Sequence, residues 1–557
     1  MAKSAKPAQI SGPPAWLWPA LLLAALLAYL PAIDGPFIFD DLTVVPLHPG
    51  GSPPLRSLVT SSRPLFYLSL WLDRQLFGLS PLPMHVINIV LHLLNACLMM
   101  AVLKRIAGLA RIDEAKRSWL AVAGAGVFLL HPALTEGVSY IVSRSEVLSL
   151  FFGLAAFLVF LSAETIGAGR AAAVLLLFAL AAMSKEHSFA FVPLMFLTAM
   201  WFGETPMKGL KSRVLVFVPL VAGGVLGAVY VFKSVGVQAT AGFGVQGQTP
   251  LTYLATQCHV IWRYVLMFIL PGGMNIDHAI GFSSSLLEPL PAAGSVALLA
   301  ASFAAFKYRR VYPLAGFGWL AFLILLAPTS SVIPIADAMT DRRLYLSSFG
   351  LLAIVLEWLS RQPIPSIKMS AGCAAVLLVL ASLTWSRNHD YTSAERLWRA
   401  SIAENPANAR AHFQLAHALY SGGGCAESSD EYQQAYRLGQ KGADLLVDWA
   451  LALDCAGQSE AAAGKLNDAL GKDPRSFHAR STLGMIHGKQ GRLDEALAEL
   501  NQAIELNRRF DMTWTYRGNI LFMMGRREEA ASDFKRALAL NPDNPAAQKG
   551  LAATMAR

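Results

Sequence analysis

Five short polar stretches interrupt the largely apolar first part of the chain, and they hold the residues best suited to chemistry. They read FDD (39–41), HPALTEGVSYIVSRSE (131–146), SKEHS (184–188), NIDHAIG (275–281) and TDRRLY (340–345). Together they supply carboxylates, imidazoles, guanidinium groups and an amine. Ionisable side chains at membrane depth are costly and usually face a cavity. If these stretches meet on one side of a membrane, they indicate an active site at that surface.

Each stretch also has a purely structural interpretation. Asp40 and Asp41 could simply open a solvated loop. His131 and Glu136 could each cap the end of a helix, and Arg144 could be the ion partner of Glu136. Each of these interpretations accounts for a single stretch and leaves the others unexplained.

The remaining cations have similar alternatives. Lys185 and Glu186 could neutralise each other, and Arg342 and Arg343 could lie among lipid headgroups. Taken one at a time, structural and functional interpretations weigh about equally. Five such stretches on one side of a membrane favour function.

The composition places the first part of the chain in a membrane. Hydrophobic residues make up 54% of the chain and charged residues 15%, which excludes a disordered protein. Apolar runs of roughly 17–25 residues are typical of transmembrane helices. We predict eleven spans, at 15–32, 84–103, 119–135, 146–163, 171–184, 188–203, 214–232, 290–306, 311–328, 344–360 and 370–385. The amphipathic segment 253–270 is predicted to be a re-entrant or interfacial helix.

The distribution of charge predicts the orientation. The net charge of +9 belongs entirely to residues 1–385, because residues 386–557 carry 21 basic and 21 acidic residues. Basic residues cluster in every second predicted loop, so the N-terminus and these loops are predicted to be cytoplasmic. The polar stretches and the C-terminal part then lie on the opposite side. This explains the basic excess without a nucleic acid partner.

The first span allows two interpretations. A cleaved signal peptide would also begin with a basic segment followed by an apolar stretch. Here the apolar stretch is long and no A-x-A site follows it, so we favour a retained anchor.

A period of 34 residues marks the C-terminal part. Glycines recur at this spacing at Gly423, Gly457, Gly491 and Gly525. The period is that of the tetratricopeptide repeat, a helix–turn–helix unit in which the glycine supplies the turn. We predict a capping helix at 390–406 and four repeats at 407–440, 441–474, 475–508 and 509–542. Such solenoids present a concave groove to peptides or proteins, and a structural stalk or an oligomerisation surface is the alternative.

Two of the five cysteines, Cys425 and Cys455, lie in neighbouring repeats. They could pair if the repeats are extracytoplasmic. Because no CxxC or metal-type cluster is present, we favour two ordinary small residues buried between helices.

The polar stretches and the repeats together resemble one known family. The chain is similar to the transmembrane and tetratricopeptide-repeat O-mannosyltransferases and their bacterial relatives, within the GT-C glycosyltransferase superfamily. The resemblance covers nearly the whole chain and rests on residues 39–41, 130–152, 184–188, 263–278, 329–348 and 405–416. Two departures are visible. Asp341-Arg342 stands where the family often has Glu-Arg, and the repeat array is shorter than in many animal members.

The resemblance implies an inverting transferase with a polyprenyl-phosphate sugar donor. A carboxylate would take the proton of an acceptor Ser or Thr hydroxyl. Asp40 is the predicted base, Asp41 is the alternative, and Glu136 is the third acid assigned to catalysis. Cations would hold the departing lipid phosphate. The predicted donor-phosphate residues are Arg144, Lys185, Arg342 and Arg343.

The resemblance also implies substrate-binding residues around these groups. Those predicted to orient the sugar or the acceptor are His131, Glu186, His187, Asp277, His278 and Asp341. Asp40, Asp41 and Glu136 could supply oxygen ligands to a metal. A phosphate already held by arginine and lysine requires none, so we expect neither a metal nor a cofactor.

The sequence thus predicts an all-α protein with two parts. Residues 1–385 would form a polytopic GT-C-type transferase domain and residues 386–557 a tetratricopeptide-repeat solenoid. The expected partners are a polyprenyl-phosphate-linked sugar, an acceptor protein held by the repeats and the lipid bilayer. We expect the cell inner membrane with periplasmic repeats, or the endoplasmic reticulum with lumenal repeats. The alternatives are an oligosaccharide transferase and a non-catalytic repeat scaffold on a membrane anchor.

Overall fold

The structure is a computed structural model that describes residues 12–45, 61–203, 210–235, 242, 244–245, 247–362 and 367–555. Every extended regular element in these ranges is a helix, as predicted. The chain divides into two compact units, 1–397 and 398–557.

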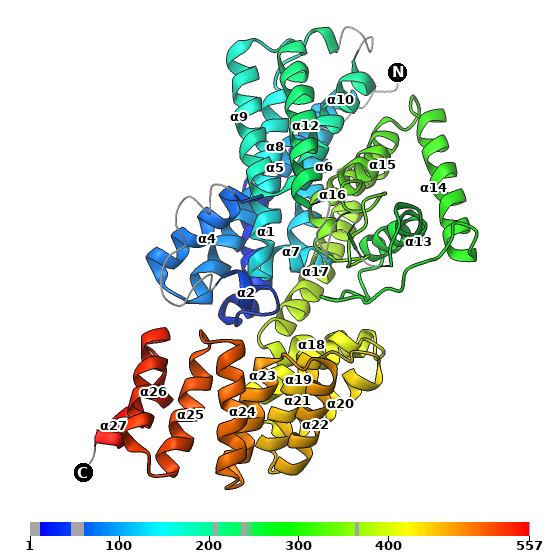
Figure 1. Cartoon of the computed structure of the whole chain (residues 1–557). Coiled ribbons are helices and arrows are strands. Elements are labelled where there is room, and N and C mark those ends of the chain that lie inside the picture. The colour runs from blue at the N-terminus through cyan, green and yellow to red at the C-terminus, as the bar shows by residue number, and fades with distance from the viewer. Residues whose placement is uncertain are drawn as a thin grey trace, which may run out of the picture. The chain divides into compact units, whose positions relative to one another are not determined.

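Before α18 (Ala394–Glu404), the first unit contains fifteen described α-helices. They are α1 (Leu17–Tyr29), α2 (Asp41–Val44), α4 (Pro64–Phe77), α5 (Pro81–Leu109), α6 (Glu114–Leu130), α7 (Thr135–Ser139), α8 (Arg144–Leu161), α9 (Ala168–Ser184), α10 (Phe191–Phe202), α12 (Val214–Val235), α13 (Pro250–Ile269), α14 (Pro289–Lys307), α15 (Pro313–Leu326), α16 (Arg343–Ser360) and α17 (Ile367–Asp390). Short 3-10 turns occupy Leu30–Asp34, Pro132–Leu134, Ile141–Ser143 and Glu186–Ala190. The long helices pack side by side, with α5 against α6 and α8 and with α15 against α16 (Figure 1).

The predicted count of eleven spans is not confirmed. Among the described residues, six helices are long and apolar enough to cross a membrane. They are Leu17–Asp34, Pro81–Leu109, Ile141–Leu161, Pro289–Lys307, Arg343–Ser360 and Met369–Asp390. A bent pair, Glu114–Leu130 with Pro132–Ser139, would make a seventh.

The shortfall has a physical cause in the polar stretches, which end several helices early. The predicted span 119–135 stops at Leu130, before Pro132, and the chain turns there by 60°. The predicted spans 171–184 and 311–328 correspond to apolar helices of 17 and 14 residues, Ala168–Ser184 and Pro313–Leu326. Span 188–203 begins with a 3-10 turn and leaves only the 12 residues of α10.

Glycines allow a close contact between α15 and α16. An added Cβ at Gly350 of α16 would lie 2.3 Å from the backbone nitrogen of Phe322 in α15. At Gly318 of α15 it would lie 2.4 Å from the carbonyl oxygen of Gly350. The two backbones are therefore in direct contact in the first half of α16, which begins at Arg343 within the TDRRLY stretch.

The second unit is the predicted tetratricopeptide array. Its helices pair as α19 (Ala409–Ser421) with α20 (Cys425–Arg437), α21 (Ala443–Cys455) with α22 (Ser459–Lys472), α23 (Phe477–Lys489) with α24 (Leu493–Leu506), and α25 (Asp511–Met523) with α26 (Arg527–Leu540). The pairs stack in a row and end at α27 (Pro545–Met555) (Figure 1). Gly423 and its three counterparts have φ of 77–82°, a left-handed conformation that explains why glycine recurs at each turn.

The two repeat cysteines correct a prediction. We favoured two separate buried residues, but Cys425 and Cys455 form a disulfide, with their Cα atoms 5.6 Å apart. Cys425 begins α20 and the exposed Cys455 ends α21. Antiparallel packing of these neighbouring helices brings one helix start next to the other helix end, which the linear spacing of 30 residues does not reveal.

Candidate active site

The predicted residues lie at helix ends and turns of the first unit. Glu136 is in the one-turn helix α7, Lys185 follows the last residue of α9, and Arg342 precedes α16. Asp40 precedes α2. Polar side chains gather there because helix termini leave backbone groups unpaired and interrupt the apolar surface.

Arg342 and Glu136 form the central ion pair. The Arg342 guanidinium donates to Glu136 Oε1 at 2.5 Å, and the Arg342 backbone N–H donates to Oε2 at 3.1 Å. The guanidinium also lies 5.9 Å from the ring centre of Tyr140. The Tyr140 hydroxyl in turn accepts a hydrogen bond from the backbone N–H of Asp40 at 2.8 Å. Residues 40, 136 and 342 therefore belong to one polar cluster.

Lys185 pairs with Glu146, a residue that the sequence analysis did not assign. Glu146 is 2% exposed, and its second oxygen faces His187 Nδ1 at 3.2 Å. His187 Nε2 lies 3.2 Å from the Ser149 hydroxyl. Burial lowers the pKa of His187 to about 4, so the ring is neutral near pH 7. Burial also lowers the pKa of the Lys185 amine, against the opposing effect of Glu146.

Glu186 does not pair with Lys185, contrary to the structural alternative considered above. It accepts two hydrogen bonds from Arg63, at 2.8 Å from Nε and 2.5 Å from Nη2. Burial acts to raise the pKa of Glu186, but the Arg63 and Lys185 charges outweigh it and lower the pKa to about 2. Arg63 was missed by sequence reasoning. The available signal was an arginine in the segment between the first two predicted spans, which was predicted to face away from the basic loops.

A carboxylate–imidazole pair, Asp341 with His278, lies beside this cluster. Asp341 Oδ1 is 2.6 Å from His278 Nε2, and Oδ2 accepts the backbone N–H of Asn275 at 2.9 Å. Burial acts to lower the pKa of His278, but Asp341 outweighs it and raises this pKa. Asp277 is also buried, and its Oδ1 accepts the backbone N–H of Ala279 at 3.3 Å.

All four predicted phosphate-binding cations contact other protein groups. Lys185 and Arg342 pair with carboxylates of the cluster, whereas Arg144 and Arg343 also bind backbone carbonyls. Arg144 is fully buried and forms an ion pair with Asp73. It also donates to the Asn88 side-chain oxygen and the Met84 carbonyl, each at 2.8 Å. Glu136, the partner considered for Arg144, instead binds Arg342.

Arg343 donates to the carbonyl oxygens of Ala338 at 2.9 Å and Asp337 at 2.6 Å. These bonds close the turn before α16. His131 has a comparable role at the end of α6. Its Nδ1 accepts the backbone N–H of Ala133 and its ring stacks on Phe268, with centres 4.6 Å apart.

The two aspartates of the FDD stretch differ in burial and in hydrogen bonding. Asp41 is fully buried and accepts the backbone N–H groups of Ile38 at 3.2 Å and Val142 at 2.9 Å. Burial raises the pKa of Asp41 to about 8 despite these two bonds. Asp40 is only partly buried. Phe39, which precedes it, has a φ of 49° that turns the chain sharply at this point.

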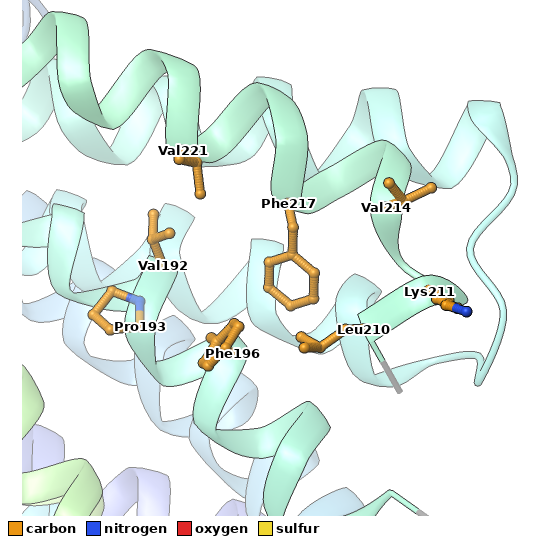
Figure 2. A pocket seen from close by; sticks show the side chains of 8 residues that line it. All are labelled: Val192, Pro193, Phe196, Leu210, Lys211, Val214, Phe217 and Val221. Atoms are coloured by element: carbon orange, nitrogen blue, oxygen red, sulfur yellow. The ribbon is translucent and has the colours of Figure 1, made fainter. Parts of the chain in front are cut away.

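A separate apolar pocket of about 480 Å³ lies between α10 and α12 (Figure 2). Apolar side chains such as Val192, Phe196, Phe217 and Val221 line it, and Lys211 is its one charged lining residue. None of the predicted site residues belongs to its lining. Within the described part of the chain, no group of three or more His, Cys, Asp or Glu side chains has the arrangement of a metal site.

The fold and the charged cluster define a class of protein, an all-helical chain with membrane-type helices and tetratricopeptide repeats. Tetratricopeptide-repeat family models match residues 386–443, 447–509 and 512–544. A protein O-mannosyl-transferase of Caenorhabditis elegans is 23% identical over 448 residues, covering 75% of this chain and 62% of the relative. Protein O-mannosyl-transferase TMTC3 of Homo sapiens is 23% identical over 592 residues, covering 91% and 62%. The chain is a homologue of the protein O-mannosyl-transferases, as the resemblance predicted, and it spans about 62% of the length of these two relatives.

Solved structures of tetratricopeptide-repeat proteins are similar to part of the chain. The crystal structure of YrrB, described as a tetratricopeptide-repeat protein with an unusual peptide-binding site, is 20% identical. The match covers 35% of this chain and 94% of that one, with a TM-score of 0.24.

Proposed function

We propose that this chain is a membrane glycosyltransferase that moves a sugar from a polyprenyl-phosphate carrier to Ser or Thr hydroxyls of extracytoplasmic proteins. The observation that carries the proposal is the cluster in which Arg342 pairs with Glu136 and lies over Tyr140, which holds Asp40. Such a transfer needs two groups, a carboxylate that acts as general base and a cation that binds the phosphate. The homologues named O-mannosyl-transferases support the same reaction class.

Asp40 is proposed as the base. The acceptor oxygen attacks the anomeric carbon, its proton passes to the Asp40 carboxylate, and the bond from that carbon to the phosphate oxygen breaks. Attack opposite the leaving group inverts the anomeric configuration. Asp41 is the weaker alternative, since backbone N–H groups already occupy both of its oxygens.

The leaving group is a polyprenyl phosphate, whose negative charge needs cations. Arg342 and Lys185 are proposed to hold it, with Arg63 beside Lys185 as an added candidate. Each of the three is paired with a carboxylate, so a phosphate would share a cation that is already positioned. Arg144 and Arg343 are better placed to support the surrounding turns than to bind a ligand.

The repeats are proposed to recruit the acceptor protein on the extracytoplasmic side of the cell inner membrane. The alternation of basic loops supports this orientation. The Cys425–Cys455 disulfide supports it independently, because disulfides persist in oxidising compartments such as the periplasm.

The test is transfer from a polyprenyl-phosphate mannose, labelled in the sugar, to a Ser/Thr-rich peptide by the full chain in nanodiscs. We expect product from the wild type and none from Asp40→Asn. The matched control is Asp113→Asn, an exposed aspartate before α6 in a predicted cytoplasmic loop. Equal transfer by Asp40→Asn and the wild type would overturn the assignment of the base. A wild type inactive with every polyprenyl-phosphate sugar would overturn the function.

A further inference from the structure

Two buried side chains at the end of α17 have unused hydrogen-bonding groups. Arg387 is 7% exposed and Tyr391 is 2% exposed. Arg387 Nη1 donates to Asp390 at 2.9 Å, but Arg387 Nη2 and the Tyr391 hydroxyl have no hydrogen-bond partner among the described residues. Buried polar groups are nearly always paired, since an unpaired one costs the free energy of removing it from water. These two donors therefore point to a ligand.

The end of α17 is held firmly against the charged cluster. Asn388 accepts a hydrogen bond from the Ser139 hydroxyl, at the end of the helix α7 that carries Glu136. The Asn388 amide donates to the carbonyl oxygen of Ala28 in α1 at 3.0 Å. On the other side, a Cβ at Gly35 would lie 2.6 Å from the Tyr391 carbonyl oxygen. The two unused donors thus have a fixed position relative to Glu136.

The charges that face these donors identify the kind of ligand. Asp341 and Asp390 act electrostatically on both Arg387 and Tyr391, and Glu136 acts on Tyr391. Arg387 also acts on His278, the partner of Asp341. Two carboxylates beside the guanidinium and a third beside the phenol disfavour a phosphate or another anion. A neutral polyol fits, because its hydroxyls donate to carboxylates and accept from guanidinium and phenol groups.

We propose that Arg387 and Tyr391, together with Asp341 and Glu136, form a subsite for the hydroxyls of the transferred hexose. Arg387 Nη2 and the Tyr391 hydroxyl donate to sugar oxygens, and the carboxylates accept from sugar hydroxyls. This inference rests on the proposed function and extends it. Arg342 and Lys185 hold the phosphate of the donor, whereas Arg387 and Tyr391 at the end of α17 bind the hydroxyls of its sugar.

The test compares two lipids that differ only in the hexose. Nonaprenyl phosphate and nonaprenyl-phosphate mannose are titrated against the full chain in nanodiscs. We expect the wild type to bind the mannosylated lipid more tightly. Tyr391→Phe removes only the hydroxyl, and Arg387→Lys keeps the charge beside Asp390 while removing Nη2. Each should reduce the preference for the mannosylated lipid by about three- to tenfold, the effect of one lost hydrogen bond, with unchanged binding of nonaprenyl phosphate.

A matched control keeps the result specific. Tyr253 is also buried, and its hydroxyl donates to the Thr329 carbonyl at 2.7 Å, so Tyr253→Phe should retain the wild-type preference. If both test variants also retain the preference, the hexose subsite is wrong and the donors bind only solvent. If the wild type binds neither lipid, the proposed function itself fails, which is a different result.

Discussion

Arg342 and Glu136 are joined twice, through the guanidinium at 2.5 Å from Oε1 and through the backbone N–H at 3.1 Å from Oε2. The pair connects the turn before α16 to α7, 206 residues earlier in the chain. Glu136 therefore positions both the backbone and the side chain of the residue proposed to hold the donor phosphate.

Arg342→Gln should fail in two separable ways. Loss of the cation should slow transfer by about 100-fold, as with the loss of one charge-stabilising donor. The buried Glu136 would also lose its partner, so unfolding should become easier by about 3 kcal/mol. The measurements are transfer rate and thermal unfolding midpoint.

The double variant Glu136→Gln/Arg342→Gln separates the two effects. With no uncompensated charge left, most of the stability should return while transfer stays slow. If the double variant regains transfer as well, Arg342 acts only through stability and its role at the phosphate is wrong.

Asp41→Asn should change the pH dependence of stability rather than abolish transfer. The folded-state pKa of Asp41 is about 8, above the ordinary aspartate value of about 4, so the folded chain binds this proton more tightly. That contribution to stability is complete below about pH 4 and is lost as the pH rises through about 8. The wild-type unfolding midpoint should therefore fall between about pH 6 and pH 9 more steeply than that of Asp41→Asn. Parallel curves for the two proteins would contradict the assignment.

The repeats were predictable because their signal is local. A glycine every 34 residues reports a left-handed turn, and Gly423, Gly457, Gly491 and Gly525 all adopt one. The period needs no knowledge of distant contacts. The disulfide between Cys425 and Cys455 was not predictable in the same way, since it depends on how two helices lie against each other.

The sequence indicated which polar stretches form the candidate site, but not which of their side chains pair with each other. Residue types indicated that Arg144 and Lys185 would have partners at membrane depth. Which partners they have depends on packing across tens of residues. Arg144 binds Asp73, 71 residues away, and Lys185 binds Glu146, 39 residues away. Arg63 was missed because a single arginine carries no periodic or motif signal. The predicted span count is not confirmed among the described residues, because apolar runs do not reveal where a 3-10 turn interrupts a helix.

The disulfide predicts the compartment of the repeats. In intact cells, Cys425 and Cys455 should react with a thiol reagent only after a reductant is added. Cys97 is a free cysteine, so in the unfolded protein it should react without any reductant. Cys455→Ser should lower the stability of the repeats by about 3.6 kcal/mol, the loop-entropy value for a separation of 30 residues. The measurement is the mass shift with a maleimide reagent on non-reducing gels. Free thiols at both positions in intact cells would contradict an oxidising environment.

The contact between α15 and α16 predicts how the site is supported. Gly350→Ala places a Cβ 2.3 Å from the Phe322 nitrogen, which neither backbone can accommodate without moving. We expect a loss of about 1–3 kcal/mol in stability, as for other overpacked sites. Because α16 begins at Arg343, the turn that carries Arg342 should shift as well, and transfer should slow even at temperatures where the variant is folded. The control is Gly372→Ala in α17, where a Cβ meets no atom within 4 Å and alanine favours the helix. Normal transfer by folded Gly350→Ala would show that the turn before α16 is held independently of this helix contact.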